Sequence, residues 1–259
     1  MSPEPAPALP PSLPPLVAQT EQPHMSEAAR LAGVFFSPGK AFADIARKPR
    51  WWIPLILISI LSTVYLTAFT QRVGWESVLR PAIESNQATQ SMPVQQREQL
   101  IRTAAGYYKY VGYLSVIGTL FSVFIVAVIL MFLFDTMMSA SIGLKRMMAI
   151  VAYGFLPLVI QTALSMVVLY LKDPEEFNLR NPLIFNAGAF MSPDSSAALR
   201  ALGSSIDLFS LWIIILLAIG VSAAGRKISF GKAFAGIVLP WALLVCLKVA
   251  AAAAGMQVG

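Results

Sequence analysis

The chain has 259 residues, of which 57% are apolar and only 12% are charged, and its formal net charge is +6. Soluble domains carry about 25% charged residues, so this composition excludes an ordinary water-soluble globular protein. It does not indicate a nucleic acid partner either, because the cations flank long apolar runs, where Lys and Arg set membrane orientation and contact anionic lipid.

Residues 1–25 are predicted to form a disordered, extended tail, because proline and alanine dominate their composition. The tail lacks the basic start and the continuous apolar core of a cleavable signal peptide. We therefore expect the first apolar run to act as an uncleaved signal for membrane insertion.

Residues 26–50 are expected to form an amphipathic helical segment on the cytoplasmic membrane surface. Ser37 before Pro38 is typical of a helix start, and Pro49 of a stop before the first apolar run. The side chains expected to enter lipid are Leu31, Phe35, Phe42 and Ile45. The cations expected to contact anionic headgroups are Arg30, Lys40, Arg47, Lys48 and Arg50. The alternative is a connector packed on protein.

Five apolar runs follow, and each is long enough, or nearly so, to cross the roughly 30 Å hydrocarbon layer as a helix of about 20 residues. They lie at residues 52–70, 113–135, 147–171, 206–223 and 233–254. The sequence therefore predicts an all-α, polytopic membrane protein. Its membrane domain, residues 51–256, would contain five transmembrane helices, preceded by an N-terminal amphipathic interfacial helix.

The loops predict the orientation of these helices. With five spans, the short loops at 136–146 and 224–232 lie on the same side as the N-terminus, and both carry cations without any acidic residue. The positive-inside rule then places the N-terminus in the cytoplasm and the C-terminus outside. We expect a bacterial inner membrane, with a eukaryotic endomembrane as the alternative.

The residues that usually carry catalysis are scarce. The single histidine, His24, lies in the predicted tail, and the single cysteine, Cys246, lies in the last apolar run. A metal centre needs clustered His, Cys or carboxylate ligands, and a Ser-His nucleophile needs a histidine in the folded part. We expect a non-enzyme with no catalytic, metal-binding or cofactor-binding residue and no cofactor.

Several polar or helix-breaking positions within or beside the apolar runs are candidate structural or functional sites. They are Asp135, Tyr153, Gly154, Pro157, Gln161, Asp207 and Lys248. Ionisable residues in a membrane are costly and often functional. Asp207 and Lys248 fall at similar depth on opposite-running spans, which predicts a mutually stabilising pair. Pro157 predicts a kink, and Gly154 a close approach of a neighbouring helix.

Short motifs in a fixed order resemble those of bacterial members of the Yip family. They are FSPGKAF at 36–42, KPRWW at 48–52, AYGFLP at 152–157, and the closing segments 212–224 and 231–233. The resemblance covers residues 31–254 and implies five spans with a cytoplasmic N-terminus. Eukaryotic members of the family are implicated in early secretory-pathway traffic through contacts with Rab-type GTPases and with one another. The chain has no clear match to their Asp-Leu-Tyr-Gly-Pro-type motif, which leaves a small GTPase as a doubtful partner.

These observations favour an integral membrane scaffold, or a membrane-organising or trafficking-type protein. Its expected partners are the lipid bilayer, anionic lipids, another membrane protein or further copies of the chain. The alternative is a small-solute or ion transporter or channel, acting as an oligomer. That alternative requires a water-accessible cavity reaching mid-membrane and lined by Gln161, Ser165 or Lys248.

Overall fold

The computed structural model describes residues 24–179, 182–192, 194–225 and 227–255, so the predicted tail lies almost entirely outside the described residues. The described ranges are helical, and one isolated bridge between Asn186 and Asp207 is their only β-pairing. The α-helices are α1 (Glu27–Phe36), α2 (Pro38–Arg47), α3 (Trp52–Arg72), α4 (Trp75–Glu84), α5 (Gln87–Gln90), α6 (Val94–Met131), α7 (Leu144–Gly154), α8 (Pro157–Leu171), α9 (Ala197–Ser205), α10 (Leu208–Ala224) and α11 (Phe230–Ala253). A π-helical segment, η1 (Phe132–Met137), continues α6, and short 3-10 turns lie at Pro174–Glu176 and Ala187–Phe190.

The all-α polytopic membrane fold is confirmed. Four helical segments within the described ranges are long and apolar enough to cross a membrane, namely Trp52–Arg72, Val94–Met137, Leu144–Leu171 and Phe230–Ala253. The remaining expected span corresponds to α10, whose 17 residues cover about 25 Å at 1.5 Å per residue. That length is below the roughly 30 Å of an average hydrocarbon layer. The total of five spans therefore stays a prediction.

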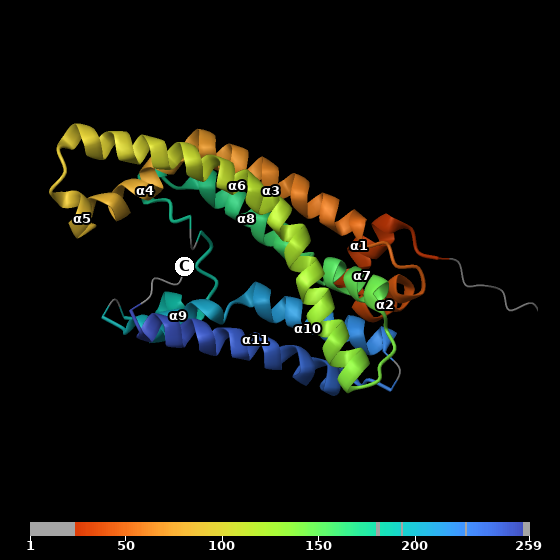
Figure 1. Ribbon diagram of the computed structural model, residues 1–259. Coiled ribbons are helices and arrows are strands. Elements are labelled where there is room, and N and C mark those ends of the chain that lie inside the picture. Colours follow the sequence, from red (N-terminus) through yellow and green to blue (C-terminus); the bar gives the residue numbers. More distant parts are fainter. Residues whose placement is uncertain (1–23, 180–181, 193, 226, 256–259) are drawn as a thin grey trace, which may run out of the picture.

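The helices are arranged as two arms that meet at one end (Figure 1). In the first arm α3 packs against α6 and α8, and in the second α11 packs against α9 and α10. The arms join where α2 and α7 both pack against α10, with α1 against α2. We call this junction of α1, α2, α7 and α10 the base.

Local sequence explains where several helices begin. The hydroxyl of Ser26 accepts a hydrogen bond from the Ala29 amide and caps α1, and Pro38 occupies the first turn of α2. The Asp207 carboxylate accepts the amides of Phe209 and Ser210 and so caps α10. These caps satisfy amides that have no carbonyl partner within their own helix.

The main hydrophobic core lies in the base and extends along α6 and α11. Val34, Ala41, Phe42 and Ile45 of the N-terminal helices have no exposed surface. They belong to the same cluster of buried side chains as residues of α7 and α10. A second, smaller cluster lies at the far end of the first arm, around Phe69.

The expectation that Phe42 and Ile45 enter lipid is therefore wrong. The antiparallel pair α1–α2, which we call the hairpin, buries its apolar face against protein, while Phe36 at its tip is 86% exposed. Gly220 of α10 makes this packing possible, because a Cβ there would lie 2.9 Å from Cδ1 of Phe42. This packing agrees with the alternative raised from the sequence, a connector packed on protein, while a position at the membrane surface stays a prediction.

The third apolar run is interrupted at the predicted position. α7 ends at Gly154, α8 begins at Pro157, and Phe155 and Leu156 form a turn between them. Pro157 has no amide hydrogen to donate and cannot sit in a helix interior without disrupting it. The interruption lies where Pro157 predicted a kink, and α7 and α8 follow one another as two helices (Figure 1).

Candidate functional site

An ion pair between Arg30 and Asp44 closes the hairpin from inside. Arg30 Nε donates to Asp44 Oδ2 at 2.7 Å, and each side chain is only 1% exposed. A second guanidinium nitrogen of Arg30 donates to the carbonyl of Lys48 at 3.1 Å, just beyond the end of α2. Two buried charges cost several kcal/mol to desolvate unless they are paired and hydrogen-bonded, as they are here. The pair therefore fixes how α1 lies on α2.

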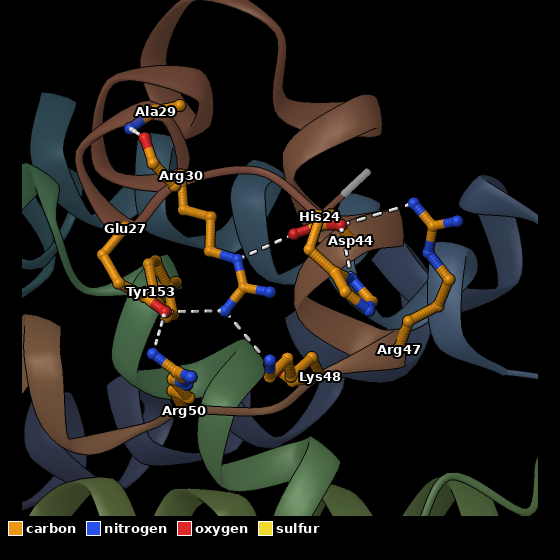
Figure 2. Close-up of polar contacts among 10 residues, drawn as sticks. His24, Glu27, Ala29, Arg30, Asp44, Arg47, Lys48, Arg50 and Tyr153 are labelled. Carbon is orange, nitrogen blue, oxygen red and sulfur yellow. Dashed lines mark hydrogen bonds and ion pairs between the residues drawn. The ribbon is translucent and has the colours of Figure 1, made fainter. Parts of the chain in front are cut away.

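Glu27 extends this pair into a cluster that spans three parts of the chain (Figure 2). Its Oε1 accepts hydrogen bonds from Arg30 and from Arg50, both at 3.1 Å. Its Oε2 accepts the hydroxyl of Tyr153 at 2.7 Å. Because Arg50 precedes α3 and Tyr153 lies on α7, one carboxylate connects the hairpin to both helices. We call Glu27, Arg30, Asp44, Arg50 and Tyr153 the hairpin cluster.

The rim of the hairpin cluster reaches solvent on the Asp44 side. Arg47 donates to Asp44 Oδ1 at 3.3 Å, and His24 Nδ1 lies 3.4 Å from the same oxygen. Burial raises the pKa of the Asp44 carboxyl, but the hydrogen bond and positive charge of Arg30 outweigh this effect. The pKa of Asp44 therefore lies below its ordinary value of 3.8, and the carboxylate stays ionised at neutral pH.

Three residues of the AYGFLP motif have different structural roles. Tyr153 is fully buried and reaches the hairpin cluster. A Cβ on Gly154 would lie 2.6 Å from Cδ2 of Leu217, so only glycine lets α10 come this close. Pro157 then starts α8. The close approach of a neighbouring helix at Gly154 is confirmed, and the motif as a whole positions α7 between the hairpin and α10.

Asp135 organises the loop that leads into α7. Its two carboxylate oxygens accept the amides of Ile142 and Gly143, both at 2.7 Å. The residue stands in η1, where the π-helical turn ends α6. The carboxylate therefore holds the 138–143 loop across the end of the second apolar helix, and it needs no cation partner to do so.

Asp207 and Lys248 are held apart in separate contacts, and the direct pair expected from the sequence is not among the ion pairs of the described residues. Asp207 caps α10, and its second oxygen accepts the hydroxyl of Ser210. Lys248 Nζ donates to Ser204 Oγ at 3.2 Å and so connects α11 to α9. The reason is local: Asp207 satisfies its own helix start, which leaves the lysine to the neighbouring helix end.

Gln161 and Asp207 line one cavity, and no residue of the hairpin cluster lines it. Its volume is about 140 Å³, and Ser204, Phe185 and Phe209 also line it. Ser165 donates to the backbone carbonyl of Gln161 at 2.9 Å and is buried. The cavity brings Gln161, Asp207 and Ser204 together, but neither Ser165 nor Lys248 is among its lining residues.

The cations expected to face lipid divide into two groups. Arg47 and Arg50 contact the carboxylates of Asp44 and Glu27, whereas the side chains of Lys40 and Lys48 are exposed. Arg30, also expected to face headgroups, is buried inside the hairpin, so that expectation is wrong. Lipid contact by the other four remains a prediction.

The sequence reasoning missed the hairpin cluster, although a signal was present. Arg30 stands four residues before Val34, and Asp44 stands three residues after Ala41, so both charges lie on the buried faces of their helices. Charges of opposite sign at apolar-face positions of adjacent helices predict a buried pair. No group of three or more His, Cys, Asp or Glu side chains that could hold a metal ion occurs in the part of the chain that the structure describes.

Comparison with known proteins agrees with the family resemblance seen in the sequence motifs. The sequence profile of the Yip1 domain matches residues 32–251. The chain is also 24% identical to a Bacillus subtilis (strain 168) protein described as membrane protein YknW. That match covers 201 residues, which are 77% of this chain and 80% of the relative. No solved structure matches the chain. The profile match includes the second half of α1, all of α2 and the apolar helices up to residue 251 in α11.

Proposed function

This chain belongs to the Yip1 domain family, and from that premise we propose that it is a non-catalytic membrane scaffold of the Yip type. It is an integral, multi-pass membrane protein, as both the apolar helices and the bacterial relative indicate. We place it in a bacterial inner membrane with the base toward the cytoplasm, following the distribution of cations in the short loops.

The observation that carries this proposal is the way the base is built. The hairpin is not a loose membrane anchor, because the hairpin cluster and the main core both fix it to α7 and α10. A segment fixed this way presents its outer surface in one orientation, which is what a docking platform requires. Pre-organised surfaces bind with a smaller entropic cost than flexible ones.

The outer surface of the hairpin has a definite chemistry. On α2 the exposed residues Lys40, Ala43 and Arg47 follow helical spacing and form one stripe, and Phe36 projects at the tip. We call these four residues the hairpin face. A cationic stripe beside one exposed aromatic side chain suits a partner with acidic and apolar groups, either another membrane protein or a second copy of the chain.

The transporter alternative receives less support. It needs a continuous polar path, and the cavity at Gln161 and Asp207 is small and lacks the other residues we expected along such a path. The five side chains of the hairpin cluster are engaged with one another. They act as structural connections between helices, which favours a scaffold.

Site-specific photo-crosslinking in native membranes tests the proposal. A photoreactive residue at Lys40 or Ala43 should give the same protein adduct from both positions, identified by mass spectrometry as one membrane protein or a second copy. The matched control is Ser85, which is also exposed but lies after α4, a helix that packs against α6 in the first arm and is not part of the base. The adduct should weaken when Arg47 is replaced by Glu. Lipid adducts alone at all three positions, or ion conductance after reconstitution in liposomes, would contradict the scaffold function.

A further inference from the structure

A second feature of the base is a surface cavity of about 350 Å³ between the end of α2 and the start of α7. Three of its lining residues are cations, namely Arg47, Lys145 and Arg146, and none is acidic. The remaining lining residues are Pro49, Ile142, Gly143 and Leu144. Like charges that line one cavity repel each other, and an anion among them removes that repulsion. We call this feature the basic cavity.

The cations of the basic cavity are only partly neutralised by the protein. Arg47 shares Asp44 with Arg30. Lys145 and Arg146 take part in none of the ion pairs found among the described residues, and both are exposed. The nearest carboxylate along the chain, Asp135, is already bonded to two backbone amides. Two of the three positive charges are thus available to a ligand.

The backbone at the floor of the cavity favours the same sign of ligand. α7 starts there after Gly143, and no side chain caps its first turn. A helix start carries partial positive charge and free amide groups that bind phosphate oxygens. Gly143 has φ of +78°, a conformation that suits glycine, and no atom lies within 4 Å of the position that a Cβ would take, so a ligand can approach the backbone on that side. The Gly143 amide itself is bonded to Asp135, which leaves the amides of the first turn of α7 for a ligand.

We propose that the basic cavity binds a phosphate group, with Lys145 and Arg146 as its main contacts and Arg47 as a third. The phosphate is carried either by an anionic phospholipid of the adjacent leaflet or by a soluble phosphate ion. Arginine and lysine at the ends of membrane helices are the residues that bind lipid headgroups in this way. This inference does not depend on the scaffold function, because lipid binding can be lost while the protein contacts of the hairpin face remain.

The test uses the full-length protein in nanodiscs and in detergent. The variant Lys145→Gln/Arg146→Gln removes the two available charges. The control Lys227→Gln/Lys232→Gln removes two exposed cations from the same predicted side but outside the cavity. A third variant, Lys145→Arg/Arg146→Lys, keeps the charge. Thermal unfolding of each variant verifies that it is folded.

The lipid experiment measures retention of phosphatidylglycerol against phosphatidylcholine by native mass spectrometry. We expect the cavity variant to lose phosphatidylglycerol affinity by about tenfold or more, since each of the two cations removed contributes about fivefold. The control and the charge-keeping variant should stay within about twofold of the unmodified protein.

The phosphate experiment measures how much inorganic phosphate raises the unfolding temperature of the protein. A rise that the cavity variant loses and the control keeps, with no difference in lipid retention, identifies a soluble phosphate as the ligand and supports the cavity. Equal behaviour of the cavity variant and the control in both the lipid and the phosphate experiment would overturn the proposal. It would show that these cations act only as diffuse surface charge.

Discussion

Tyr153 Oη donates a hydrogen bond of 2.7 Å to Glu27 Oε2, joining two residues that are 126 positions apart in the chain. The tyrosine belongs to the AYGFLP motif of α7, and the glutamate stands in the first turn of α1. This contact shows that the N-terminal segment is part of the membrane fold and is not an appendage to it.

Replacing Tyr153 with Phe is expected to reduce the stability of the protein by about 1–3 kcal/mol, because it removes a buried donor from a charged, partly buried acceptor. The measurement is thermal or denaturant unfolding of the purified protein in detergent. Tyr107→Phe is the matched control, since Tyr107 is 67% exposed, and its effect should stay within about 0.5 kcal/mol. Equal effects of the two substitutions would show that the hydrogen bond contributes nothing.

Breaking the buried pair of Arg30 and Asp44 should be more damaging. Asp44→Asn or Arg30→Met leaves one buried charge without its closest partner, with an expected loss of up to about 3–5 kcal/mol. The double substitution should cost clearly less than the sum of the single ones, because it leaves no unpaired charge. Arg80 and Glu98, which are paired at the surface, provide the comparison and should show much weaker coupling. Additive effects at Arg30 and Asp44 would reject the buried pair.

The same pair predicts how stability depends on pH. The pKa of Asp44 is lower in the folded protein than in the unfolded chain, so as pH falls the unfolded chain takes up the proton first. The contribution of the pair is therefore fully present above the ordinary pKa of 3.8 and is lost as pH falls through the folded value. The stability difference between the unmodified protein and Asp44→Asn should shrink below about pH 4. A difference that grows on acidification would contradict the assignment.

The orientation of the chain can be tested in intact cells. In a Cys246→Ser background, single cysteines at Ser141 and Ser229 should react only after the membrane is permeabilised, because both positions lie in short loops predicted to be cytoplasmic. A cysteine at Ser91, between α5 and α6, should react from outside. Labelling of Ser141 or Ser229 by an impermeant reagent in intact cells would reverse the topology.

The membrane helices were predictable where one physical property of the sequence, such as a long apolar run or a proline, determined them. Long apolar runs identified each membrane helix, and Pro157 located the break between α7 and α8. The lengths of the helices were less predictable. α6 begins at Val94, well before the apolar run at 113–135, because residues 94–112 include many polar side chains that do not belong to the apolar pattern. α10 shows the opposite case. The apolar run at 206–223 predicted a membrane span, but the helix has only 17 residues, because apolar composition does not determine how far a helix reaches across the membrane.

The candidate site was less predictable, because it depends on which surface the hairpin meets. Phe42 and Ile45 form an apolar face that suits lipid and protein equally well, and hydrophobicity cannot separate the two. The charges could have separated them: Asp44 on the buried face is costly in lipid but stable beside Arg30. The pairing of Asp207 with Lys248 failed for a different reason: similar depth does not determine which contact a side chain makes, and Asp207 caps its own helix.

The central claim is that the hairpin is held by protein contacts in the base and not by the lipid surface. Hydrogen–deuterium exchange of the full-length protein in nanodiscs tests it most directly. In purely zwitterionic lipid, the amides of α1 and α2 should exchange slowly, and Asp44→Asn should speed exchange in α1, α2 and α7 together. Fast exchange of α1 and α2 in zwitterionic lipid, slowed only by anionic lipid, would instead show an interfacial helix and contradict the account.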